Sequence, residues 1–89
     1  MKNGKEVPSA KTALAANVKR LRESMGLSQE KLAEQAGFHR TYVSQVERGL
    51  ANITLDNLDR LADELRVAAF VLIRPSGKDK GARTVMPEQ

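Results

Sequence analysis

The chain has 89 residues, enough for one domain with a single core, and its net charge of +4 is compatible with a nucleic-acid partner. It contains no cysteine and one histidine, which excludes disulfides, zinc–thiolate sites, thiol nucleophiles and histidine metal clusters, and no pattern indicates a cofactor or small-molecule ligand. No apolar run approaches the ~20 residues that a membrane span needs, and no signal-peptide pattern opens the chain, so we expect a cytoplasmic protein without membrane contact.

Residues 1–8 carry Gly, Pro and mixed charges with little to bury, which predicts a flexible N-terminal arm. A first long helix is expected to start near Ser9, a good N-cap, and to run to about Met25. Its inward stripe is formed by apolar residues at intervals of four, three and four, namely Leu14, Val18, Leu21 and Met25. Lys19, outside this stripe, is a candidate for phosphate contact.

The stretch from Leu27 to Gly49 predicts two short helices joined by a tight turn. Ser28 can cap the first helix, and Gly37 follows its last apolar residue, where a left-handed backbone commonly ends a helix. Gln29 opens this helix, and because helix N-termini carry free amides and a partial positive charge, we expect it to contact phosphate. The second helix is expected to begin near His39, which can cap it or hydrogen-bond to phosphate.

The outward side of the second short helix gathers one guanidinium, two hydroxyls and one amide, from Arg40, Thr41, Ser44 and Gln45. A solvated side without a task is usually built from Lys and Glu, whereas Ser and Thr lower helix stability. Base-pair edges in the major groove offer donors, acceptors and thymine methyls that these residue types recognise, so we predict that these four residues read bases. Arg40 is the strongest candidate, because a guanidinium can hold guanine at two acceptors; its alternative role is a phosphate contact. Tyr42, through its hydroxyl, and Arg48 are further candidates for phosphate contact.

Thr54 is expected to cap another helix, which we interpret as core scaffold. Its apolar stripe consists of Leu55, Leu58, Leu61, Ala62 and Leu65. Residues 75–89 combine Pro and Gly with an excess of basic side chains, which predicts a disordered basic tail. The domain between the arm and the tail would then span residues 9–74.

Taken together, these motifs resemble the helix-turn-helix of phage-repressor and Cro-type regulators, the xenobiotic-response-element-like family. The matching residues are Leu27-Ser28-Gln29, Leu32-Ala33, Gly37, Val43-Ser44, Val46-Glu47 and Gly49. The segment HRTYVSQVERG is also similar to the controller proteins of restriction–modification systems. The resemblance implies an all-α bundle of four to five short helices, in which the third helix enters the major groove.

The resemblance also implies an ion pair between Arg22 and Glu47 that ties the first helix to the reading helix. For the segment Val67–Ile73 it implies a fifth helix that supplies a dimer contact. The Val, Phe and Ile residues of this segment favour a strand instead, and a strand paired with its copy in a second subunit is an open alternative. In either case, seven nearly continuous apolar residues predict a homodimer.

The predicted function is that of a sequence-specific DNA-binding transcriptional regulator. A homodimer would read a near-palindromic operator whose half-site centres lie about one helical turn (~34 Å) apart. Two alternatives remain open: an antitoxin that also captures a toxin, and a protein-interaction module that kept the shape and lost DNA reading. The chain offers no cysteine, Gly-rich phosphate loop or paired inward carboxylates for an enzyme.

Overall fold

The structure is a computed structural model that describes residues 9–75. Its helices are α1 (Ala10–Ser24), α2 (Gln29–Ala36), α3 (Arg40–Glu47), α4 (Leu55–Leu65) and α5 (Ala69–Ile73). No strand occurs in this part of the chain, and the prediction of an all-α bundle of four to five helices is confirmed. The predicted arm, residues 1–8, and the predicted tail beyond Pro75 lie outside the described residues.

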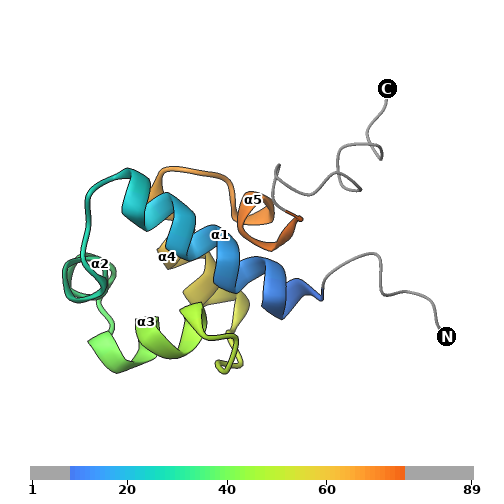
Figure 1. Ribbon diagram of the computed structural model, residues 1–89, viewed down its shortest axis with the longest axis horizontal. Coiled ribbons are helices and arrows are strands. Elements are labelled where there is room, and N and C mark those ends of the chain that lie inside the picture. The colour runs from blue at the N-terminus through green and yellow to red at the C-terminus, as the bar shows by residue number, and fades with distance from the viewer. Residues whose placement is uncertain (1–8, 76–89) are drawn as a thin grey trace, which may run out of the picture.

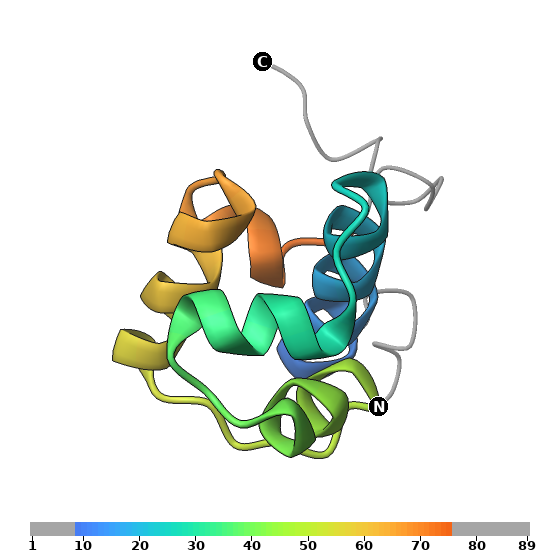
Figure 2. The same ribbon diagram turned by 90° about the vertical axis from the view of Figure 1, so that its left-hand side faces the viewer.

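The helix α1 crosses the middle of the molecule, and α3, α4 and α5 all pack against it (Figure 1). The helix α2 packs on α3 and α4. In Figure 1, α2 is seen end-on while α3 lies lengthwise; in Figure 2, turned by 90°, α2 lies lengthwise. The two short helices therefore cross steeply, and the turn between them lies beside α4 (Figure 2).

Three of the helices begin where the sequence predicts, because a hydroxyl accepts a hydrogen bond from a free amide one turn in. Ser9 Oγ accepts from the amide of Thr12 at 3.1 Å, and Ser28 Oγ accepts from the amide of Lys31 at 2.9 Å. Thr54 Oγ1 caps α4 in the same way at 3.0 Å. These caps fix the starts of α1, α2 and α4.

The helices α1 to α4 are each followed, within two residues, by a residue with positive φ, which is Gly26, Gly37, Gly49 or Arg66. In each case the amide of the following residue donates back to a carbonyl five positions earlier, at 2.8–3.1 Å, the hydrogen bond that defines a Schellman motif. Glycine adopts this conformation freely, whereas a side chain there brings Cβ close to the following carbonyl. Arg66, at φ 63°, is the exception among the four.

Replacing Arg66 by glycine is therefore expected to raise the free energy of unfolding by about 0.5–1 kcal/mol, because the left-handed strain outweighs the greater entropy of the unfolded glycine. Urea unfolding followed by circular dichroism measures the change. Gly49→Ala is the matched control, since a Cβ at Gly49 meets nothing within 4 Å and introduces only the strain. It should lower the stability by a similar amount; an unchanged stability in both variants would contradict the explanation.

The core is built from aliphatic side chains of all five helices. Its fully buried large members are Leu14, Val18, Leu32, Val43, Val46, Leu61 and Leu72. Two side chains that we predicted to be inward are exposed instead: Met25 is 38% exposed and Leu55 is 78% exposed. Met25 lies past the last turn of α1, and Leu55 opens α4, where a side chain that leans toward the helix N-terminus extends beyond the end of the helix.

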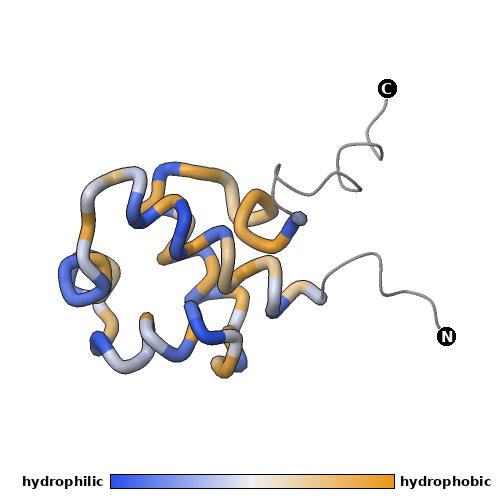
Figure 3. The backbone as a smooth tube through the Cα atoms, viewed as in Figure 1, coloured by the Kyte–Doolittle hydropathy of each residue, from blue (hydrophilic) through white to orange (hydrophobic). Residues whose placement is uncertain are grey.

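The segment that could be a helix or a strand forms the helix α5, although no side chain caps its start. Figure 3 shows α5 as an apolar coil against α1. Its last carbonyls are satisfied by Asn17, a fully buried residue of α1. Asn17 Nδ2 lies 3.1, 3.0 and 2.7 Å from the carbonyl oxygens of Val71, Leu72 and Arg74, while its Oδ1 accepts from Arg20. This amide holds α5 on the bundle.

Candidate nucleic-acid interface

The helix α3 presents a buried side to the core and a polar side to solvent. Val43 and Val46 form the inner side and are almost fully buried. Arg40, Thr41 and Gln45 are exposed, and Ser44 is half-buried. Within residues 9–75, no hydrogen bond or ion pair engages these four side chains. Their donors and acceptors are therefore available to an external partner.

A buried ion pair fixes the far end of α3. Arg22 Nε donates to Glu47 Oε2 at 2.6 Å and Nη2 donates to Oε1 at 2.9 Å, so the contact is bidentate. The two side chains are only 10% and 3% exposed. Arg22 Nη1 also donates to the carbonyl of Leu27 at 2.7 Å, and Gln29 Nε2 donates to Glu47 Oε1 at 3.0 Å. Glu47 therefore joins α1, the start of α2 and the end of α3.

The hydrogen bond from Arg22 to Glu47 raises the pKa of the guanidinium, and burial opposes the shift. A raised pKa means that the pair stabilises the fold below the ordinary arginine value and is lost only as the pH rises through the raised one. The cation consequently persists over the whole neutral and acidic range.

The five candidates for phosphate contact differ in their surroundings. Lys19 and Arg48 are exposed. Gln29 is half-buried at the start of α2, and one hydrogen of its amide is directed to Glu47, which leaves the second. His39 is exposed at the N-cap position of α3. Its side chain makes no capping hydrogen bond, so the prediction that this side chain can cap α3 is wrong.

Tyr42 is half-buried between the turn and α4. Its ring centroid lies 4.8 Å from that of Phe38, and its hydroxyl accepts a hydrogen bond from Asn57 Nδ2 at 3.2 Å. The hydroxyl proton remains available as a donor.

Sequence reasoning missed three polar residues whose side chains join one helix to another segment: Asn17, Asn57 and Arg60. Each is a polar residue within a helix, so an apolar stripe omits it, although Asn17 lies at helical spacing from Leu14 and Leu21. Each acts on a segment at least 15 positions away along the chain, so no local pattern indicates its role.

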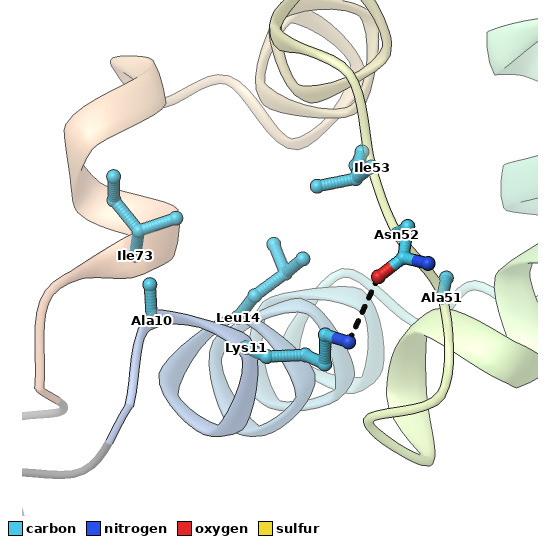
Figure 4. A pocket seen from close by; sticks show the side chains of 7 residues that line it. All are labelled: Ala10, Lys11, Leu14, Ala51, Asn52, Ile53 and Ile73. Carbon is cyan, nitrogen blue, oxygen red and sulfur yellow. Dashed lines mark hydrogen bonds between the residues drawn. The ribbon is translucent and has the colours of Figure 1, made fainter.

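A hollow of about 260 Å³ lies where the start of α1, the α3–α4 loop and the end of α5 meet (Figure 4). Its lining is mostly apolar and consists of Ala10, Lys11, Leu14, Ala51, Asn52, Ile53 and Ile73. Lys11 Nζ donates to Asn52 Oδ1 at 2.9 Å across its mouth, which ties α1 to the loop that follows α3. Phe70, one turn before Ile73 on α5, is 61% exposed.

In the part of the chain that the structure describes, no group of three or more His, Asp or Glu side chains could hold a metal ion. No helix between residues 9 and 75 is long and apolar enough to cross a membrane.

A steeply crossed helix pair with a free polar side on its second helix defines the class of DNA-binding helix-turn-helix regulators, which are not enzymes. A family model described as "Helix-turn-helix" matches residues 18–72, and the chain belongs to this family, of the Cro/C1 type.

Two sequence relatives illustrate the family. A Neisseria hypothetical transcription factor from Neisseria meningitidis serogroup B is 48% identical over 65 residues, which cover 73% of this chain and 61% of that protein. Control protein C.SmaI from Serratia marcescens is 45% identical over 67 residues, which cover 75% of this chain and 80% of that protein. The match thus spans less than two thirds of the Neisseria relative.

Two solved structures of similar sequence have the same fold as this chain. The crystal structure of the hypothetical transcription factor NHTF from Neisseria superposes with a TM-score of 0.74 at 43% identity, covering 81% of this chain and 86% of that chain. The restriction-modification controller protein C.AhdI from Aeromonas hydrophila superposes with a TM-score of 0.67 at 39% identity, covering 70% and 94%.

Proposed function

We propose that the protein is a sequence-specific transcriptional regulator that inserts α3 into the major groove and reads bases with Arg40, Thr41, Ser44 and Gln45. The observation that carries this proposal is the polar side of α3. Among residues 9–75, side-chain bonds hold Arg22 and Glu47 to each other, but no such bond engages any of the four. These residue types match the donors, acceptors and methyl groups of base edges.

Phosphate contacts by Gln29, Lys19, His39, Tyr42 and Arg48 would set the register of α3 without reading sequence. The amides at the start of α2 support this role, because a helix N-terminus attracts anions. The hydrogen bond from Gln29 to Glu47 supports a fixed placement of this phosphate contact relative to α3, so that one orientation of the protein serves both the groove and the backbone.

The regulator acts as a homodimer through Val67–Ile73, in our proposal. Phe70 is 61% exposed and Ile73 is 39% exposed on α5, beside the apolar hollow, which supports a covered face rather than a solvated one (Figure 4). A two-fold dimer implies a near-palindromic operator with half-site centres about 34 Å apart. The domain of residues 9–74 would be the unit that dimerises.

Selection of bound sites from random duplexes at two salt concentrations tests the proposal, together with the mass of the protein by sedimentation. Arg40→Ala should relax the preference at one base pair per half-site, a loss of about 1–3 kcal/mol of discrimination. Arg48→Ala is the matched control: it should weaken binding to all duplexes alike and reduce the salt slope by about one. A monomer that selects no sequence would overturn the proposal.

A control protein of a restriction–modification system is the more specific candidate within this function. Its support is the 45% identity to C.SmaI and the superposition on C.AhdI. The selected operator should then occur upstream of restriction and modification genes in the genome of origin, and its absence there would exclude this candidate.

A further inference from the structure

Arg60, in the middle of α4, extends its side chain away from its own helix to the end of α2. Its Nε and Nη2 donate to the carbonyl oxygen of Ala36 at 3.2 and 2.9 Å, and Nη2 also donates to the carbonyl oxygen of Gly37 at 3.0 Å. These are the last carbonyls of α2, where a helix has no internal donors and carries a partial negative charge. A cation with several donors is well suited to this end.

The same guanidinium is linked to α3. Its Cζ lies 4.4 Å from the ring centroid of Phe38, and the Phe38 ring packs on Tyr42 of α3. Arg60 Nη1 lies 3.4 Å from Asn57 Oδ1, and Asn57 Nδ2 donates to the Tyr42 hydroxyl. The contacts therefore form a closed circuit through α4, the end of α2, the turn and α3.

Gly37 makes room for this arrangement. Its φ of 81° favours glycine, and a Cβ at this position would lie 2.5 Å from Arg60 Nη2. At Gly26 and Gly49, which also have positive φ, a Cβ would meet nothing within 4 Å. The requirement for glycine in the turn is thus partly a requirement for the approach of Arg60.

We propose that Arg60 is a positioning residue for DNA reading: by holding the end of α2 and the ring of Phe38, it sets the angle at which α3 presents its polar side. This role rests on the proposed function. Arg60 need not touch DNA, because its donors are directed at protein carbonyls. Arg60 would affect sequence discrimination by setting the orientation of α2 relative to α3. The helix α2 carries the proposed phosphate contact, and α3 carries the residues proposed to read bases.

The test compares Arg60→Met with Arg66→Met, which removes the same charge from the C-cap of the same helix. Binding is measured well below the unfolding midpoint, to the selected duplex and to an unrelated one, at several salt concentrations. Arg60→Met should lower the ratio of the two affinities about tenfold, since misaligned base contacts lose part of their discrimination. The salt slope should stay unchanged, because no phosphate contact is removed. Arg60→Lys, which keeps a donor, should recover part of the ratio, and Arg66→Met should leave it unchanged.

Hydrogen exchange of the free protein gives an independent measurement. The amide of Phe38 donates to the carbonyl of Ala33 at 2.8 Å in the turn, and Arg60→Met should make its exchange about tenfold faster, with the amides of α1 unaffected. The fluorescence of Tyr42, the only tyrosine in a chain without tryptophan, should change as well.

An unchanged affinity ratio in Arg60→Met overturns the proposal, because Arg60 would then only add stability. An equal loss on both duplexes with a salt slope reduced by about one also overturns it, because Arg60 would be a phosphate contact. If the unmodified protein prefers no duplex, the proposed function fails, and unchanged exchange at Phe38 would separately reject the positioning of the turn.

Discussion

Arg22→Ala should lower the free energy of unfolding by about 3–5 kcal/mol, a large part of the ~5–15 kcal/mol that stabilises a typical domain. The substitution leaves the carboxylate of Glu47 in a site where its side chain is 3% exposed, with one amide hydrogen of Gln29 as its remaining donor among the described residues. An uncompensated buried charge is expensive, and the removal of the large Arg22 side chain also opens space beside the core.

Glu47→Ala should be milder, because the cation that remains has other partners. Arg22 keeps its bond to the carbonyl of Leu27, and it lies 3.9 Å from Glu23, whose side chain is 58% exposed. The long arginine side chain can also turn its charged end toward water. We expect a loss of about 1–3 kcal/mol, smaller than that of Arg22→Ala.

Urea unfolding of both variants, followed by circular dichroism, measures this asymmetry. Lys31→Ala is the matched control, because Lys31 and Glu34 form an ion pair at 3.5 Å whose side chains are 54% and 71% exposed, and such pairs contribute about 0–1 kcal/mol. If Arg22→Ala lost no more stability than Lys31→Ala, the buried Arg22–Glu47 pair would contribute no more to the free energy of unfolding than an exposed pair. Its role in holding α3 would then have to be abandoned.

Much of the fold could be predicted because it depends on neighbours in the sequence. The caps Ser9, Ser28 and Thr54 act on amides three positions away, and Gly37 ends its helix through its own backbone. Local patterns carry such information directly. The polar side of α3 likewise follows from the spacing of polar residues within one short helix.

Local sequence patterns do not predict structure that depends on contacts between residues far apart in the chain. The Val and Phe residues of Val67–Ile73 favour a strand, and the helix is supported instead by the amide of Asn17, 54 to 57 positions away. A periodic pattern also cannot indicate where the core stops, so the apolar stripe of α4 includes Leu55 although its side chain is exposed. Asn17 is therefore the residue whose substitution best separates local propensity from tertiary support.

Asn17→Leu should lower the free energy of unfolding by about 2–4 kcal/mol and release α5. Leucine has nearly the same shape as asparagine, so the main change is chemical: the carbonyls of Val71, Leu72 and Arg74 lose their donor in a largely buried site. An acceptor left without a partner when buried costs about 1–3 kcal/mol, and solvent reaching the end of α5 relieves part of this penalty.

Urea unfolding and hydrogen exchange together measure this effect. The amide of Val71, which donates to the carbonyl of Ala68 at 2.9 Å, should lose its protection in Asn17→Leu before α1 unfolds. Arg20→Leu is the control: it removes the donor to Asn17 Oδ1 and leaves the three carbonyls of α5 with theirs, so it should cost less than Asn17→Leu and leave Val71 protected. Because the proposed dimer contact lies on α5, Asn17→Leu should also shift sedimentation toward the monomer. Full protection of Val71 in this variant would mean that apolar packing alone holds α5, and that the buried amide is not what selects the helix over a strand.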